Sequence, residues 1–143
     1  MKNLYRFLFI VVLLNSLLIT AQAQSLSGEW KLVAAKQNGK NVSFGREIRT
    51  NLIFGAENRI SGNGGCNRYS TTYKLTGKNR LKFEPIIATK MACLENDFMR
   101  QETVFFGVME KVKEYKIKGN YLIFSDGEKR NVLRFARVGK QKQ

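Results

Sequence analysis

The stretch NDFMRQETVFFGVMEKV, residues 96–112, decides the fold class of this chain. At about 100° per residue its apolar side chains fall in one stripe, which is the pattern of an amphipathic helix. Asn96 is the expected N-cap, and Lys111 and Lys113 follow near the negative end of the helix dipole. The stripe consists of Phe98, Phe105, Met109 and Val112, widened by Phe106 and Val108.

On both sides of this helix the sequence has short runs typical of β-strands, separated by turn residues. Three of the turns predict hairpins: residues 55–58, where Asn58 tolerates positive φ, and residues 76–79 and 118–120. We therefore expect a meandering antiparallel sheet with the helix lying across it. The expected strands are residues 29–34, 51–54, 59–61, 71–75, 80–83, 113–117, 121–124 and 132–136.

The composition excludes several functional classes. The 143 residues include 25 Lys or Arg, 11 Asp or Glu and no His, so the formal net charge is +14. Without histidine there is no Ser-His-Asp or Cys-His catalytic pair and no imidazole ligand for zinc or haem. A glycosidase needs only two carboxylates, but no local pattern marks such a pair. We expect no catalytic residues, no metal and no cofactor.

Residues 1–23 are predicted to be a secretory signal peptide. Lys2 and Arg6 precede an apolar run over residues 7–19, and Ala21-Gln22-Ala23 is a small-residue cleavage site. An uncleaved membrane anchor is the alternative, but it needs ~20 largely apolar residues. No cysteine stands at the cleavage point, so a bacterial lipoprotein anchor is not expected. The sequence predicts one domain over residues 24–138 and a frayed basic tail over 139–143.

Cys66 and Cys93 are the only cysteines, and both lie in the part expected to be exported. Oxidising compartments favour a disulfide between them. Closing a loop of this size would stabilise the domain by about 3 kcal/mol in the chain-entropy model. Two buried free thiols are the alternative interpretation.

Cys66 ends a glycine-rich run, Ser61-Gly62-Asn63-Gly64-Gly65-Cys66, which continues as Asn67-Arg68-Tyr69. Asn67 stands at the third glycine position of a dinucleotide fingerprint and no Gly-Lys-Ser/Thr follows, so a nucleotide site is not expected. The segment predicts a tight structural turn instead. Gly62, Asn63, Gly64 and Gly65 would permit positive φ and place Cys66 within reach of Cys93.

Several segments together resemble the META domain family, which includes HslJ-like heat-shock and envelope proteins. They are residues 26–32 (LSGEWKL), 61–69 (SGNGGCNRY) and 88–93 (ATKMAC), then Gln101-Glu102 with Phe105. The resemblance covers nearly all of the chain after the signal peptide. It implies an α+β fold, a strongly curved antiparallel sheet or partial barrel packed against one main helix. It also implies a non-catalytic role in envelope or stress physiology, and it supplies no active site to transfer.

Glu102 falls inside the apolar stripe of the predicted helix. A buried carboxylate needs a cation or backbone donors, and Arg68 is a candidate partner by residue type. We expect a salt bridge that fixes the helix to the glycine-rich turn. A polar binding site is the alternative.

Removing the signal peptide takes away Lys2 and Arg6 and lowers the net charge only from +14 to +12. Such a surface predicts an anionic partner. For an exported monomer we expect envelope components or another envelope protein, in the periplasm, at the outer membrane or outside the cell, and not nucleic acid. The alternative is that many of the lysines only keep strand edges from pairing.

Overall fold

The computed structural model describes residues 25–139. The predicted signal peptide and residues 140–143 of the predicted tail lie outside the described residues. Ten strands and one helix follow one another along this part of the chain. The strands are β1 (Gly28–Gln37), β2 (Lys40–Val42), β3 (Asn51–Phe54), β4 (Arg59–Asn63), β5 (Arg68–Gly77), β6 (Arg80–Phe83), β7 (Ile87–Ala88), β8 (Glu114–Lys118), β9 (Tyr121–Ser125) and β10 (Val132–Arg137), and the helix is α2 (Asn96–Met109).

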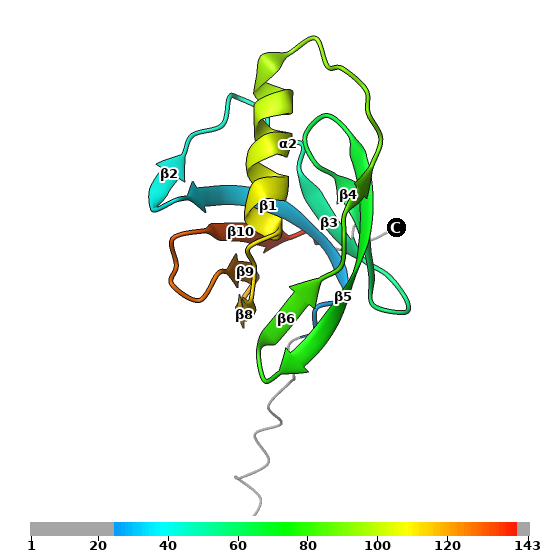
Figure 1. The fold of residues 1–143 in the computed structure, drawn as a ribbon, viewed down its shortest axis with the longest axis vertical. Coiled ribbons are helices and arrows are strands. Elements are labelled where there is room, and N and C mark those ends of the chain that lie inside the picture. The colour runs from blue at the N-terminus through cyan, green and yellow to red at the C-terminus, as the bar shows by residue number, and fades with distance from the viewer. Residues whose placement is uncertain (1–24, 140–143) are drawn as a thin grey trace, which may run out of the picture.

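Eight of these strands form a closed antiparallel barrel (Figure 1). The hydrogen-bonded order is β1-β3-β4-β5-β6-β8-β9-β10, and β10 pairs with β1 to complete the ring. Strand β2 pairs with the end of β1, and β7 pairs with β5, outside the ring. The expected curved antiparallel sheet with one helix is confirmed, and the curvature goes as far as closure.

The ring is unevenly closed. Strands β1 and β10 are matched over six residue pairs, with an irregularity between Leu32 and Ala34. Strands β6 and β8 are matched only at Arg80 and Glu114. Two further hydrogen bonds flank that pair, from Leu81 N to Lys113 O (3.1 Å) and from Tyr115 N to Asn79 O (2.9 Å). The barrel therefore has one loose seam, between β6 and β8.

The helix is shorter than the apolar pattern predicts. It begins at Asn96 but ends at Met109, because the chain turns there to enter β8, although Val112 is still buried. Glu95 holds the N-cap position and makes no side-chain cap, so the prediction of Asn96 as the cap is wrong. At the other end the N–H of Glu110 donates to the carbonyl of Phe106.

Aromatic side chains from the helix and the barrel form one core. Phe105 of α2 packs edge-on against Phe135, which packs in the same way against Phe124. Trp30 is fully buried and donates from Nε1 to the carbonyl of Leu26 (2.8 Å). Phe105 thereby packs the helix against β10 and, through Phe135, against β9, and α2 also contacts β1, so the helix is part of the core. Within residues 25–139, no helix combines the length and apolar character needed to cross a bilayer.

Candidate functional site

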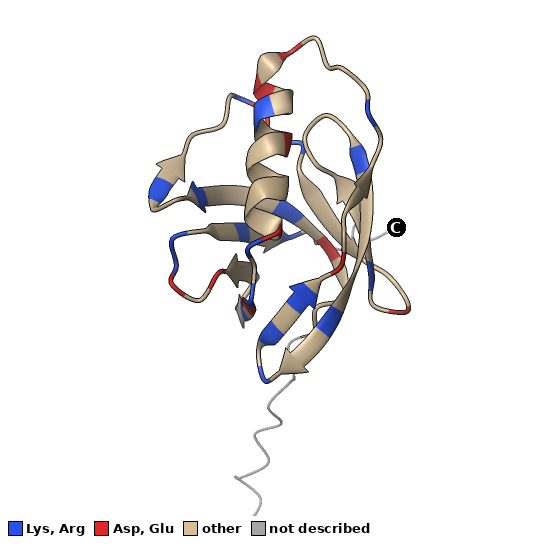
Figure 2. Cartoon of the chain, in the orientation of Figure 1, with Lys and Arg blue, Asp and Glu red and all other residues tan. Residues whose placement is uncertain are grey.

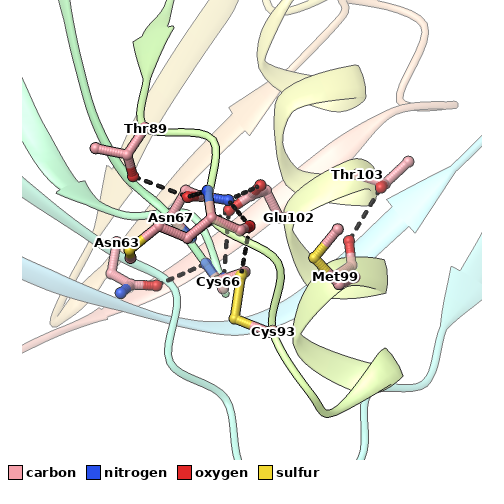
Figure 3. Close-up of a disulfide and its surroundings, with 10 residues drawn as sticks. Asn63, Cys66, Asn67, Thr89, Cys93, Met99, Glu102 and Thr103 are labelled. Carbon is pink, nitrogen blue, oxygen red and sulfur yellow. Dashed lines mark hydrogen bonds between the residues drawn. A yellow bond between two sulfur atoms is a disulfide. The ribbon is translucent and has the colours of Figure 1, made fainter.

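A disulfide joins Cys66 to Cys93 beside α2, as predicted (Figure 3). The Cα atoms of the two residues lie 5.9 Å apart. The bond ties the turn before β5 to the loop before the helix, and the alternative of two free thiols is wrong. Because structural disulfides persist in oxidising compartments, it indicates an extracytoplasmic location.

The glycine-rich turn packs directly on the helix. A Cβ at Gly64 would lie 2.7 Å from Cζ of Phe106, and one at Gly65 would lie 2.6 Å from the carbonyl oxygen of Phe98. Gly65 has φ +138°, and it is the only member of the predicted turn set with positive φ. The turn lies where the sequence analysis predicted it, but Gly62 and Gly64 are required there because a Cβ would not fit, and not because of positive φ. For Gly62, the atom that an added Cβ would clash with is the Asn51 carbonyl oxygen.

Asn67 connects the turn to the loop before the helix. Its side-chain Oδ1 accepts hydrogen bonds from Met91 N (2.7 Å) and Thr89 Oγ1 (2.8 Å). Its Nδ2 donates to Met91 O (3.2 Å) and to Oε1 of Glu102 (2.8 Å). The residue is 2% exposed, and both acceptor positions and both donors of its amide are used.

Glu102 extends from the helix to the same turn, where N–H groups surround its carboxylate. Oε2 accepts from the backbone N–H groups of Cys66 and Asn67, and Oε1 accepts from the Asn67 side chain. The predicted pairing with Arg68 is wrong, because Arg68 is exposed on β5. Among the described residues the ion pairs are Arg49–Glu47 and Lys74–Glu84. N–H groups of the turn therefore satisfy the Glu102 carboxylate in place of the cation that the sequence analysis predicted.

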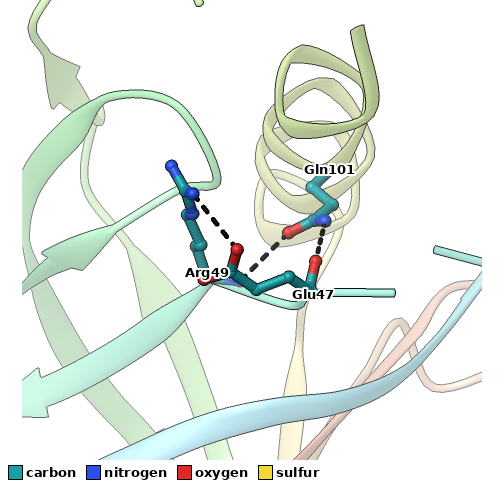
Figure 4. A network of polar contacts seen from close by, with 3 residues as sticks. All are labelled: Glu47, Arg49 and Gln101. Atoms are coloured by element: carbon teal, nitrogen blue, oxygen red, sulfur yellow. Dashed lines mark hydrogen bonds and ion pairs between the residues drawn. The ribbon is translucent and has the colours of Figure 1, made fainter. Parts of the chain in front are cut away.

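Gln101, the neighbour of Glu102, is a buried polar residue that sequence reasoning missed. Its Nε2 donates to the Glu47 carbonyl (2.6 Å) and its Oε1 accepts from Arg49 N (3.2 Å), as Figure 4 shows. The side chain is fully buried and holds the segment before β3 against the helix. Its position inside the apolar stripe of the helix was a signal that could have identified it.

Arg68 lines a groove of about 410 Å³ on the outer face of β3, β4 and β5. Polar atoms in this groove form hydrogen bonds with one another. The Asn51 side chain accepts from Asn63 N (2.8 Å), and Tyr69 Oη donates to the Asn51 carbonyl (3.0 Å). Burial raises the pKa of Tyr69 well above its usual value, so its hydroxyl stays protonated as a donor.

Lys and Arg are spread over the strands and greatly outnumber Asp and Glu (Figure 2). No group of three or more Cys, Asp or Glu side chains within residues 25–139 is arranged to hold a metal ion. Asn67, Glu102, Thr89 and the backbone of Cys66 and Met91 form what we call the polar centre, in which hydrogen bonds join the glycine-rich turn, the disulfide loop and the helix.

Solved structures similar to this one share its fold. One is an NMR structure of a protein with 21% identity and a TM-score of 0.55, covering 77% of this chain and 88% of that chain. A second, from Burkholderia xenovorans, has 23% identity and a TM-score of 0.61, covering 80% and 83%. The third is a crystal structure of a DUF4847 family protein from Bacteroides vulgatus, with 18% identity and a TM-score of 0.56, covering 81% and 95%.

At these identities the similarities establish the fold alone. No curated protein gives a significant match to the sequence. The META domain profile, in contrast, matches residues 23–139, which include every strand of the barrel and the helix. The glycine-rich turn, the disulfide and Glu102 all lie within the matched range. The chain therefore belongs to the META domain family.

Proposed function

We propose that this META domain is an exported, non-catalytic protein that acts in cell-envelope or stress physiology. The observation that supports this most is that the hydrogen-bonding atoms of the polar centre are already paired with one another. The Asn67 amide makes all four of its hydrogen bonds within the chain, and the Glu102 carboxylate receives three N–H donors from the turn. A catalytic carboxylate must face a substrate, whereas this one faces backbone.

Export is supported by the disulfide and by the predicted signal peptide. Both agree with a protein that folds outside the cytoplasm, in the periplasm, at the outer membrane or beyond it. The direct test is the mass of the protein recovered from the envelope or medium of expressing cells. A mature chain beginning at Gln24 is expected, and recovery of the intact precursor in the cytoplasm would contradict export.

The structural role of Glu102 is tested by Glu102→Gln. The substitution replaces a charged acceptor facing backbone N–H groups by a neutral amide, so we expect a loss of about 1.5–3 kcal/mol in the free energy of unfolding. Chemical denaturation measures it. The control is Glu110→Gln, an exposed carboxylate just past the end of the same helix, which should change stability by less than about 0.5 kcal/mol. An unchanged Glu102→Gln stability would contradict the structural role and favour a binding site.

The physiological role is tested in a host strain that lacks the gene. We expect poorer survival of heat or detergent stress, restored by the full chain but not by a chain without residues 2–23. Rescue by the unexported chain would contradict an envelope role.

A second candidate function is a binding or inhibitory module that captures an acidic envelope partner through its basic surface. It is supported by the net charge of +12 that remains after removal of Lys2 and Arg6 from +14, together with the small number of cations held in ion pairs, Arg49 and Lys74, in the described part. A heparin column is the simplest probe. Retention that falls steeply with salt is expected, and no retention at low salt would contradict this function.

A further inference from the structure

One outer face of the barrel carries a groove of about 600 Å³ over β1, β10, β9 and β8. Strand register brings its residues into rows. One row is Ala34, Arg134, Ile123 and Lys116, and the next is Lys36, Val132, Ser125 and Glu114. Lys118 and Lys129 also line the groove. We call this surface the basic groove.

The basic groove has five cationic side chains and one carboxylate, Glu114. The cations are Lys36, Lys116, Lys118, Lys129 and Arg134, and none of them is in either ion pair of the described residues. Lys116 and Arg134 flank the same residue, Ile123, from the two neighbouring strands. The two positions are two strands, roughly 10 Å, apart on one face, and repulsion between their charges contributes nothing favourable to folding, so the fold does not explain this clustering.

Protection of a strand edge accounts for at most two of these cations. Lys116 and Lys118 lie on β8 beyond its single match with β6, whereas Lys36 and Arg134 lie on β1 and β10, which are paired on both sides and present no edge. The opposite part of the ring, β3 to β5, has a groove with a single cation, Arg68. Cations such as Arg59 also lie on that side of the ring, but they do not line its groove.

The floor of the basic groove is apolar. Ala34, Ile123 and Val132 lie between the cations, and Tyr121 stands in the next row beside Lys118. Arg134 covers the Tyr121 ring, with its Cζ 3.8 Å from the ring centroid. Basic side chains around the half-buried Ile123 and Val132 and the exposed Tyr121 suit a surface that is anionic outside and apolar beneath.

We propose that the basic groove docks the domain on an anionic lipid membrane, with lipid phosphates at the lysines and Arg134, and Tyr121 and Ile123 at the headgroup level. This rests on the second candidate function above and names its partner. A polysaccharide or a nucleic acid would use the cations but has no acyl layer for the aliphatic floor. The five cations gathered in one groove also supply the local positive charge that attracts anionic lipids.

The test is binding of the mature protein to vesicles of phosphatidylcholine with and without phosphatidylglycerol, measured by cosedimentation at low and physiological salt. Binding is expected only with phosphatidylglycerol and should weaken with salt. The groove variant is Lys116→Gln/Lys118→Gln/Arg134→Gln, at three exposed positions. Each lost cation should weaken binding about fivefold, so the triple variant should bind roughly a hundredfold more weakly.

The matched control is Arg59→Gln/Arg68→Gln/Lys90→Gln. It removes the same charge from exposed positions on β4, on β5 and after β7, away from the basic groove. Its vesicle binding should stay within about threefold of wild type, since these cations lie on the opposite part of the ring. Ile123→Thr tests the floor. It should weaken vesicle binding several-fold and leave heparin retention unchanged.

Equal weakening by the groove and control variants would overturn the basic groove as the site. Heparin retention without vesicle binding would overturn the membrane and leave acidic-partner binding standing. Failure of the wild type to bind either probe at low salt would overturn both.

Discussion

Glu102 lies in the apolar stripe of α2 and is held without a cation, because N–H groups of the turn reach both of its oxygens. Asn67 supplies two of these donors, one from its backbone and one from its side chain, and its remaining side-chain bonds go to Met91 and Thr89. At the scale of single residues, the centre of the molecule is one shared set of hydrogen bonds. Removing one member leaves the others with unpaired polar atoms.

Asn67→Asp should destabilise the domain strongly. The new carboxylate oxygen would face Oε1 of Glu102 and the Met91 carbonyl where Nδ2 now donates, so acceptor meets acceptor in a buried place. A loss of about 3 kcal/mol or more is expected in chemical denaturation. Asn63→Asp is the control, since Asn63 uses its side-chain oxygen to accept from Gly65 N and keeps that acceptor as an aspartate. Similar losses in both variants would contradict this account.

Asp126 gives the domain a specific dependence on pH. Burial alone would raise the pKa of Asp126, but hydrogen bonds from the Asn131 side chain and from the N–H groups of Asn131 and Arg130 outweigh it and lower the pKa below its usual 3.8. A lowered pKa stabilises the folded state above pH 3.8, and this contribution disappears as the pH falls through the folded pKa.

Thermal unfolding of wild type and Asp126→Asn should therefore differ near pH 7 and converge near about pH 2, where both side chains are neutral. Wild type is the more stable at neutral pH. A difference that is constant across this range would show that the charge of Asp126 is not responsible.

At the scale of elements, the contact between the glycine-rich turn and α2 sets how close the helix can lie to the barrel. Gly65→Ala adds a Cβ against the Phe98 carbonyl at a residue whose φ is +138°. A loss of roughly 3 kcal/mol or more in the free energy of unfolding is expected, from strain and overpacking together. Gly119→Ala is the control, because Gly119 has φ +56° but open space around it, and about 1 kcal/mol is expected there. Equal losses of unfolding free energy in the two variants would mean that positive φ accounts for the whole effect and that the contact with the Phe98 carbonyl adds nothing.

The elements predicted from sequence are those whose signals are local. The hairpin turns were found because Asn58 and Asn79 mark them, and both residues have positive φ in the structure. Strands β2 and β7 were missed because they are three and two residues long and exist only through pairing with β1 and β5. The backbone partners of Glu102 could not be predicted, since every residue type offers the same N–H group.

At the scale of the whole molecule, the barrel has its fewest matched strand-to-strand residue pairs between β6 and β8. Tyr115 N and Leu81 N donate across the seam between β6 and β8, and the strands then separate. Ile117 and Phe83, two residues further along each strand, point their N–H groups to the same side because strand geometry alternates. In the described ring neither has a ladder partner across the seam.

Hydrogen exchange measured by NMR should therefore be faster for the amides of Ile117 and Phe83 than for those of Leu133 and Phe135 in β10, by on the order of tenfold or more. Strand β10 is paired on both sides and provides the internal reference. Equal protection in the two places would mean that the seam is as tightly closed as the rest of the ring.

Asn67 holds the loop before the helix by the backbone of Met91, and the disulfide holds it at Cys93. The side chains of Met91 and Leu94 take no part in either attachment and point into solvent. This stretch can therefore change its sequence at little cost to the fold, in the way that antibody loops vary on a constant framework. A new recognition surface could be displayed at these two positions, by evolution or by an engineer, while the barrel beneath stays the same.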